Sequence, residues 1–134
     1  MTDRLTPRQR SALMSRIRSR DTLPELTLRR SLRRLGVSYR SYRRVAGTTV
    51  DVALPDRRTV ILVHGCFWHG CRLHYQAPKS RVEFWTRKVA VNRARDRRQV
   101  RALRHAKWRV LVIWEHSLRT DPERVLSRLL VRAR

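Results

Sequence analysis

Apolar residues recur every three or four positions in four parts of the chain, and this spacing predicts four helices. The first begins at Thr6 and Pro7, a capping side chain followed by a residue that suits the first helical turn. Leu13 and Ile17 lie on one face of this helix, and its other faces are basic. We therefore expect a basic N-terminal helix over residues 7–20.

The other three helices have start or stop signals of their own. The second begins near Pro24 and ends at Gly36, which can adopt the left-handed capping conformation. Ser80, with Glu83 three residues later, has the spacing of a capping box and predicts the start of a long third helix. The fourth begins at Asp121. One face of the third helix mixes apolar and polar residues: Val82, Trp85, Val89, Asn92, Asp96, Val100 and Leu103.

Three further stretches have the composition of strands: residues 48–54, 59–63 and 108–114. In the first, Val50, Val52 and Leu54 share one face, and Asp51 lies on the other. The second is a β-branched run suited to the centre of a sheet, and the third is apolar enough to predict a strongly buried strand. The middle of the chain is therefore expected to contain a strand that presents a carboxylate.

Length and composition predict a single folded domain over residues 1–134. A hydrophobic content of 41% with four Trp is too high for a disordered basic tail. The longest apolar runs, residues 60–63 and 110–114, are far shorter than the roughly 20 residues of a membrane helix. The N-terminus also lacks the apolar segment of a signal peptide. We therefore expect a cytoplasmic protein with no membrane partner.

The net charge is the feature that points to a partner. Lys and Arg total 33 against 10 Asp and Glu, which gives a formal net charge of +23. Such a charge repels itself in a compact state and is best accommodated by a polyanionic partner. A folded nucleic-acid-binding domain is the first hypothesis, although charge alone does not distinguish DNA from RNA.

The segment 64–78 has no periodicity, and a loop of this length is usually functional or braced by something other than secondary structure. Cys66, Cys71 and His74 follow one another there with the spacing C-x4-C-x2-H, and His116 follows the last strand. Four sulfur and nitrogen ligands suit tetrahedral structural zinc, with no position left open for catalysis. The alternative is a pair of buried thiols among loop histidines, and the spacing alone does not decide between the two.

Asp51 is followed, after a turn, by a second strand that ends at Val63 and His64. In some nucleases a strand carboxylate and a backbone carbonyl from the adjacent strand hold Mg²⁺ against the scissile phosphate. A single strand carboxylate is more often a surface residue. His64 and His69 favour the nuclease hypothesis, because a histidine that titrates near neutrality can take a proton from an attacking water. Either histidine could equally be a hydrogen-bonded loop residue.

Aromatic residues occupy the same loop and the helix after it. Phe67, Trp68 and Trp85 lie among arginines, which fits stacking or wedging between bases. The alternative for these three is that they cover the core beneath the loop. For Trp108 and Trp114 a core role is the better interpretation, because both accompany an apolar strand.

Several motifs carry a resemblance to a known family: HGCFWHGC at 64–71, Phe84-Trp85, Asn92, Arg95-Asp96-Arg97, Lys107-Trp108-Arg109-Val110 and Trp114-Glu115. Over residues 10–119 the chain resembles the very-short-patch repair (Vsr-type) DNA mismatch endonucleases. The resemblance implies an α/β, restriction-endonuclease-like fold with a central mixed β-sheet flanked by helices. It also implies Mg²⁺-dependent nicking of double-stranded DNA on the 5′ side of the thymine in a T:G mismatch, which arises by deamination of 5-methylcytosine. The helix over residues 7–20 would then contact DNA.

The resemblance also implies roles for individual residues. Asp51 becomes the principal Mg²⁺ ligand, with the backbone carbonyl of Val63 beside it. His69 becomes the general base, assisted by His64. The supporting carboxylates would be Glu25 and Asp96, and the zinc ligands Cys66, Cys71, His74 and His116. The aromatic wedge would be Phe67, Trp68 and Trp85, and the residues that read the wobble pair Met14, Lys88 and Asn92.

Two positions depart from the family pattern. Val63 stands where some relatives have Thr. This change does not affect a ligand that is the backbone carbonyl, because both residues have one. His116 replaces a cysteine, which makes the zinc site slightly harder and more sensitive to acid.

Two other classes of protein compete with the endonuclease. One is a non-catalytic, zinc-braced DNA-binding module, and the other is a basic RNA-associated protein. The joint presence of five residues argues against the module: Glu25, Asp51, His64, His69 and Asp96. The expected partners are double-stranded DNA with a T:G mismatch and mismatch-repair proteins. We expect a monomer in a prokaryotic cytoplasm, associated with the nucleoid when bound to DNA.

Overall fold

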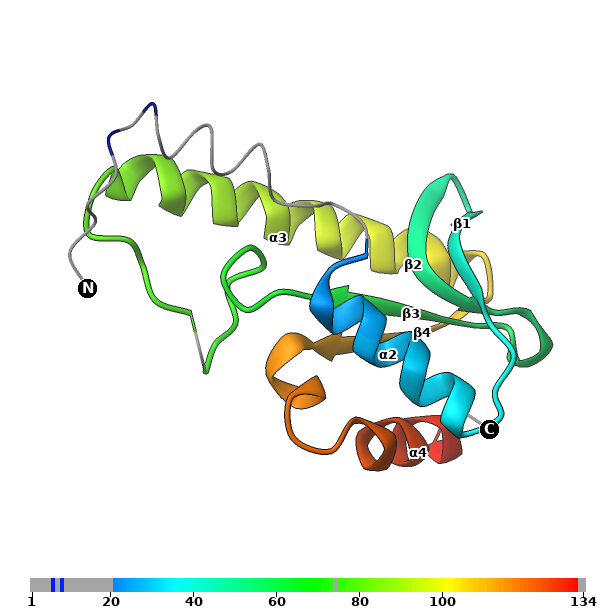
Figure 1. Cartoon of the computed structure of the whole chain (residues 1–134). Coiled ribbons are helices and arrows are strands. Elements are labelled where there is room, and N and C mark those ends of the chain that lie inside the picture. The colour runs from blue at the N-terminus through cyan, green and yellow to red at the C-terminus, as the bar shows by residue number, and fades with distance from the viewer. Residues whose placement is uncertain (1–5, 7, 9–20, 74, 133–134) are drawn as a thin grey trace.

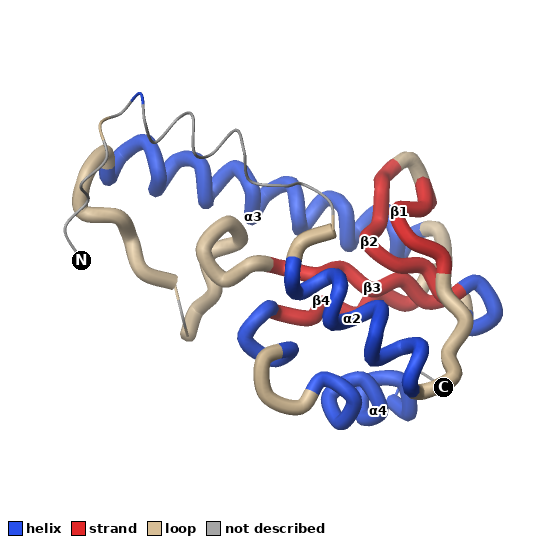
Figure 2. Tube along the Cα trace, in the orientation of Figure 1, coloured by secondary structure: helices blue, strands red, loops and turns tan. Residues whose placement is uncertain are grey.

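The structure is a computed structural model of the chain, and it describes residues 6, 8, 21–73 and 75–132. Within these residues the strands are β1 (Arg40–Val45), β2 (Thr48–Leu54), β3 (Thr59–His64) and β4 (Arg109–Trp114). They form one sheet in the order β1-β2-β3-β4. The first three strands are antiparallel neighbours, whereas β3 and β4 run parallel, so the sheet is mixed (Figure 2).

Helices cover both faces of the sheet (Figure 1). They are α2 (Leu23–Arg34), α3 (Val82–His105) and α4 (Pro122–Arg132), with short 3-10 turns η1 (Pro55–Arg57) and η2 (Glu115–Leu118). The long helix α3 lies on one face and connects the two parallel strands, while α2 and α4 pack together on the other. The predicted mixed α/β architecture is therefore confirmed.

Two apolar clusters fill the spaces between the sheet and the helices. The cluster beneath α2 and α4 contains Leu28, Leu32, Val52, Leu54, Ile61, Ile113, Leu118, Leu126 and Leu130. The cluster beneath α3 contains Val45, Val50, Ala53, Val60, Leu62 and Leu103. Neighbouring residues of β3 thus enter opposite clusters, and burial on both faces accounts for its β-branched sequence.

The alternation of β2 is interrupted at Asp51. Val52 packs beneath α2 and α4, but Val50 packs beneath α3, so the prediction that both share a face is wrong. The pairing of β2 with β1 omits Asp51 and the opposing Tyr42, and its pairing with β3 ends at Val52. Tyr42 has a φ of 50°, which is uncommon for a residue with a side chain. Asp51 therefore lies where the strand leaves the regular ladder.

The structure also contains a strand that the sequence pattern does not predict. In β1 only Val45 is buried, and most of the other residues are exposed. Because almost none of its side chains are buried, this edge strand has no period-two pattern of apolar residues. Its conformation depends on its pairing with β2.

Two details of the predicted elements are wrong. Helix α3 begins at Val82 with Arg81 as its N-cap, in a left-handed conformation, so Ser80 is not the cap. In β4 only Ile113 is buried, because this strand forms the other edge of the sheet. Trp108 and Trp114 are accordingly half-buried.

The predicted basic helix over residues 7–20 lies outside the described residues, apart from Arg8. None of the helices that the structure describes is long and apolar enough to span a membrane.

Candidate active site

The five predicted catalytic side chains line one cavity of about 750 Å³: Glu25, Asp51, His64, His69 and Asp96. They come from the first turn of α2, the interrupted part of β2, the end of β3, the loop after β3 and the middle of α3. The fold therefore brings together side chains that are far apart in the sequence. Their individual roles stay predictions.

The Asp51 carboxylate is held against the neighbouring strand. Its Oδ2 accepts a hydrogen bond of 2.7 Å from the backbone N–H of Val63. The pKa of Asp51 is raised from 3.8 to about 6, mainly by burial. The hydrogen bond from Val63 and the charge of His69 lower this pKa, whereas the negative charge of Glu25 raises it. A poorly solvated carboxylate beside a second carboxylate attracts a cation, and oxygen ligands of this kind suit Mg²⁺. The contact with Val63 is through its amide, and the role of its carbonyl stays a prediction.

His69 and Asp96 form a hydrogen-bonded pair. His69 Nδ1 lies 2.5 Å from Asp96 Oδ2. Because a carboxylate only accepts hydrogen bonds, Nδ1 carries the hydrogen, and Nε2 of the neutral ring keeps a lone pair. This arrangement fixes the tautomer that a general base at Nε2 requires.

His64 packs in parallel against His69, with ring centroids 4.1 Å apart, and touches Trp114 edge-on. The pKa of His64 is lowered to about 4, first by burial and then by the charge of His69, while Asp96 opposes the shift. The His64 side chain is 8% exposed and that of His69 is 24% exposed. Of the two rings, His69 is therefore the one that is better placed to meet a substrate, and His64 stays neutral behind it at pH 7.

Glu25 is buried and held at both carboxylate oxygens. Thr22 Oγ1 donates a hydrogen bond of 3.1 Å to Oε1, and the Tyr42 hydroxyl donates a short hydrogen bond to Oε2. The backbone N–H of Asp21 in turn donates to the Tyr42 oxygen. Sequence reasoning missed these partners. The capping-box spacing from Thr22 to Glu25 is a signal for one of them, whereas nothing in the local sequence marks Tyr42.

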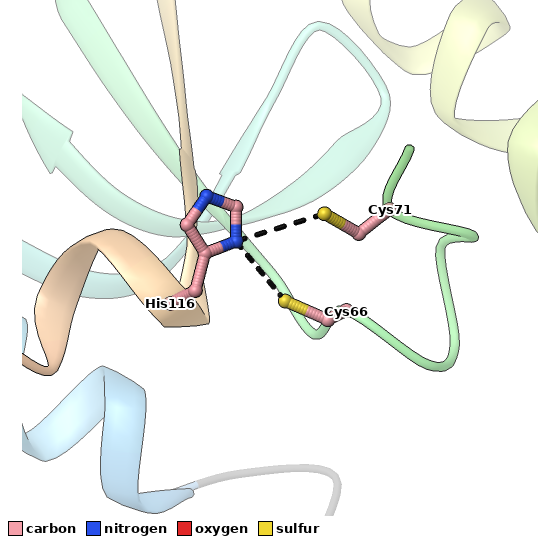
Figure 3. Close-up of side chains that lie close together, drawn as sticks. All are labelled: Cys66, Cys71 and His116. Carbon is pink, nitrogen blue, oxygen red and sulfur yellow. Dashed lines mark hydrogen bonds between the residues drawn. The ribbon is translucent and has the colours of Figure 1, made fainter. Parts of the chain in front are cut away.

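A second cluster of candidate ligands contains Cys66, Cys71 and His116, whose side chains point toward one another (Figure 3). His116 Nδ1 is 3.2 Å from Cys66 Sγ and 3.6 Å from Cys71 Sγ. Tetrahedral zinc, with Zn–S of about 2.3 Å and Zn–N of about 2.0 Å, places sulfur and nitrogen roughly 3.5 Å apart. The three donors therefore fit zinc in kind and in spacing. His74, the fourth predicted ligand, lies outside the described residues.

The neighbouring side chains of this cluster affect the protonation of its thiols. Burial raises the pKa of the Cys66 thiol, and the neighbouring Cys71 raises it too, while His116 lowers it. A bound cation reverses such shifts, because it stabilises thiolates. The backbone N–H of Cys66 donates a hydrogen bond of 2.7 Å to Glu115, which fixes the loop at the start of the cluster. The identity of the ion stays a prediction.

The three predicted wedge residues pack against one another. The ring centroids of Phe67, Trp68 and Trp85 lie 5.2 to 5.9 Å apart. Trp85 is buried, and Phe67 and Trp68 are half-buried. The two loop aromatics thus rest on Trp85, and their insertion into DNA stays a prediction.

Helix α3 positions the loop through two contacts. Asn92 donates a hydrogen bond of 2.8 Å to the carbonyl of Trp68 and lies with Lys88 beside a small cavity. Gly70 has a φ of 63°, and a Cβ atom there would lie 2.7 Å from Val89 Cγ1. The loop therefore touches α3 at a point where only glycine fits. The third predicted base-reading residue, Met14, lies outside the described residues.

Residues 2–75 match the protein family described as DNA mismatch endonuclease Vsr. The type II nicking enzyme V.XorIIP of Xanthomonas oryzae pv. oryzae is 47% identical over 120 residues, which cover 88% of each chain. The DNA mismatch endonuclease Vsr of Escherichia coli K12 is 39% identical over 112 residues, which cover 82% of this chain and 71% of that protein.

Among solved structures, the catalytic domain of the homing endonuclease I-Bth0305I superposes with a TM-score of 0.54. It is 21% identical, and the match covers 82% of this chain and 92% of that one. This likeness concerns the fold alone and agrees with a restriction-endonuclease-like architecture. From the family match and the two relatives, the chain belongs to the DNA mismatch endonuclease Vsr family and is a DNA endonuclease.

Proposed function

We propose that this endonuclease nicks double-stranded DNA on the 5′ side of the thymine in a T:G mismatch, by Mg²⁺-dependent hydrolysis of the phosphodiester bond. The observation that carries the proposal is the meeting of Asp51, Glu25 and the His69–Asp96 pair in one cavity. A non-catalytic DNA-binding module has no use for a base held in one tautomer beside one buried and one half-buried carboxylate. The whole chain, 1–134, would form one mismatch endonuclease domain.

The residues of the cavity divide the chemistry between them. Asp51 and the backbone carbonyl of Val63 would hold Mg²⁺, with Glu25 and Asp96 supporting the waters around it. When Mg²⁺ is bound, it supplies a positive charge for the negative charge that develops on the phosphate. His69 Nε2 takes a proton from the attacking water, while Asp96 holds the opposite ring nitrogen in place.

The cysteine and histidine cluster would hold zinc as a structural ion. Cys66, Cys71 and His116, with His74 as fourth ligand, leave no coordination position open for water. The ion would brace the loop that carries His69, so its contribution is to folding rather than to the reaction.

Recognition of the mismatch would depend on the aromatic residues of the same loop. A T:G wobble differs little from a normal pair in its groove chemistry, but a mispaired step costs less to unstack. Phe67 and Trp68 would enter the stack with Trp85 beneath them. Met14, Lys88 and Asn92 would read the exposed pair, and the helix over residues 7–20 would grip the backbone. The +23 charge supplies sequence-independent affinity.

The partner that this proposal requires is mismatched double-stranded DNA, bound by one copy of the chain in the cytoplasm. Contact with other mismatch-repair proteins is part of the same proposal.

A nicking assay on end-labelled duplexes tests the proposal. One duplex carries a T:G mismatch and its partner carries a T:A pair at the same position, each with and without Mg²⁺. We expect a single nick 5′ to the mispaired thymine that requires Mg²⁺ and disappears in Asp51→Ala. Asp56→Ala, which removes an exposed carboxylate, is the matched control and should nick normally. Nicking by Asp51→Ala, or equal nicking of both duplexes, would contradict the proposal.

A further inference from the structure

A second cavity of about 770 Å³ lies between α3 and the edge strand β4. It shares part of its wall, His64, His69 and Asp96, with the cavity that contains Asp51. The two cavities therefore lie on either side of the histidine pair.

Arginines line the α3 side of this second cavity. Arg93, Arg97, Arg101 and Arg104 are exposed and follow one another at intervals of four, four and three residues. This spacing places them along one flank of the helix, over roughly 16 Å at 1.5 Å per residue. We name this cavity the arginine groove.

The remaining lining of the arginine groove suits a phosphate backbone. Among its described residues the single carboxylate is Asp96, which is already hydrogen-bonded to His69. The lining also includes the apolar side chains of Val100, Val112 and Trp114. Guanidinium groups bind phosphate oxygens through paired N–H donors, and apolar surface accommodates the sugars between them.

We propose that the arginine groove binds the phosphate backbone of the substrate DNA beyond the position that is nicked. The inference rests on the proposed function, in that double-stranded DNA is the polyanion that the enzyme holds at Asp51 in the neighbouring cavity. The opposite flank of α3 carries Lys88, Asn92 and Arg95, which line cavities on the Asp51 side. Helix α3 would thus stand between two stretches of DNA, with Asp96 at the junction.

A pair of matched variants tests this inference. Arg97→Gln/Arg101→Gln removes two charges from the groove. Arg87→Gln/Arg98→Gln removes two charges from exposed positions of the same helix that line neither cavity. Binding of fully paired duplex DNA is measured by fluorescence anisotropy in Mg²⁺-free buffer between about 50 and 200 mM salt. Melting temperatures of both variants establish that the fold persists.

The expected result follows from counterion release. The slope of log affinity against log salt is negative, and each lost phosphate contact reduces its magnitude by about 0.9. Two lost contacts therefore reduce it by about 1.8. When the salt concentration rises fourfold, the fold-loss of affinity should therefore be about 12 times smaller for the groove variant than for the unmodified protein. The control variant should change the slope by less than half as much.

Three outcomes would overturn the inference or separate it from the proposed function. Equal slopes for the two variants would show that the arginines contribute only general charge. A second outcome is that the groove variant keeps the salt slope of the unmodified protein, while polyglutamate no longer competes with DNA for it. This result would assign the groove to an acidic protein segment instead. Since the assay uses intact paired DNA without Mg²⁺, a failure of T:G nicking contradicts the proposed function and leaves the groove result standing.

Discussion

Replacing Asp51 by Asn should make the metal-free protein more stable while abolishing nicking. Burial is the main cause of the raised pKa of Asp51, so the folded protein holds this charge at a cost. Asn retains an oxygen that can accept the hydrogen bond from Val63 N–H, but it carries no charge. The substitution therefore removes the cost of burying the charge and keeps the local contact.

The size and pH range of the effect follow from the pKa. A carboxyl pKa raised from 3.8 to about 6 means that the folded state binds the proton more tightly than the unfolded state. The stability that the protonated form contributes is fully present below pH 3.8 and is lost as the pH rises through 6. At about 1.4 kcal/mol per pH unit the loss reaches about 3 kcal/mol. Asp51→Asn should thus match the unmodified protein near pH 4 and exceed its free energy of unfolding by up to this amount at pH 7.

A second group titrates in the opposite sense in the same range. The pKa of His64 is lowered from 6.5 to about 4, so its contribution to stability is complete above pH 6.5 and is lost as the pH falls toward 4. The pH dependence of the unmodified protein alone therefore mixes two opposing effects. Comparison with the variant isolates Asp51, because the pKa of His64 is set by burial, His69 and Asp96.

The assay is urea unfolding of both proteins from pH 4 to 7.5 in buffer without Mg²⁺. Asp56→Asn, at an exposed position, measures the effect of losing one negative charge from a chain of net charge +23. A difference in stability that stays constant across this pH range would refute the reasoning. So would a pH-dependent difference of the same size in Asp56→Asn.

Four further variants give separate tests. His69→Ala should lower the nicking rate by about 10² to 10⁴, the usual contribution of a general base, in single-turnover assays; a normal rate would assign the base elsewhere. His116→Ala should lower the zinc content and the melting temperature before it lowers the activity per folded molecule, and an unchanged melting temperature would exclude it as a ligand. Phe67→Ala/Trp68→Ala should reduce the ratio of mismatched to matched cleavage more than it weakens non-specific binding; an unchanged ratio would place both rings in the core. Tyr42→Phe should raise the Mg²⁺ concentration needed for half-maximal nicking with little change in DNA affinity, since only the hydroxyl that holds the α2 carboxylate is lost.

The residues near the loop were predictable because they are close together in the sequence. His64, His69 and the cysteines belong to one motif, so their proximity requires no knowledge of the fold. Asp96 comes from a distant segment, and only the family resemblance gave it a role. His116 is distant too, and its donor type, which completes a set of four sulfur and nitrogen ligands, pointed to it. The fold then places Asp96 on α3 within hydrogen-bond distance of His69.

The features that could not be predicted depend on tertiary pairing. The sequence of β1 has no alternation of apolar and polar residues, and its extended conformation depends on pairing with β2 at the edge of the sheet. Val50 lies on the unexpected face because the ladder is interrupted at Asp51, and apolar spacing carries no sign of such an interruption. Tyr42 reaches Glu25 for the same reason, since it lies opposite that interruption.

Gly70 makes the two candidate sites mechanically dependent on each other. It lies between His69 and Cys71, at the point where the loop touches Val89 of α3. A displacement of the loop at this contact is transmitted in both directions along the chain. A bulkier residue at this position would lift His69 from Asp96 and, by the same movement, draw Cys71 away from His116. A mutation at this one van der Waals contact, which belongs to neither site, would thus disturb the reaction and the metal cluster together.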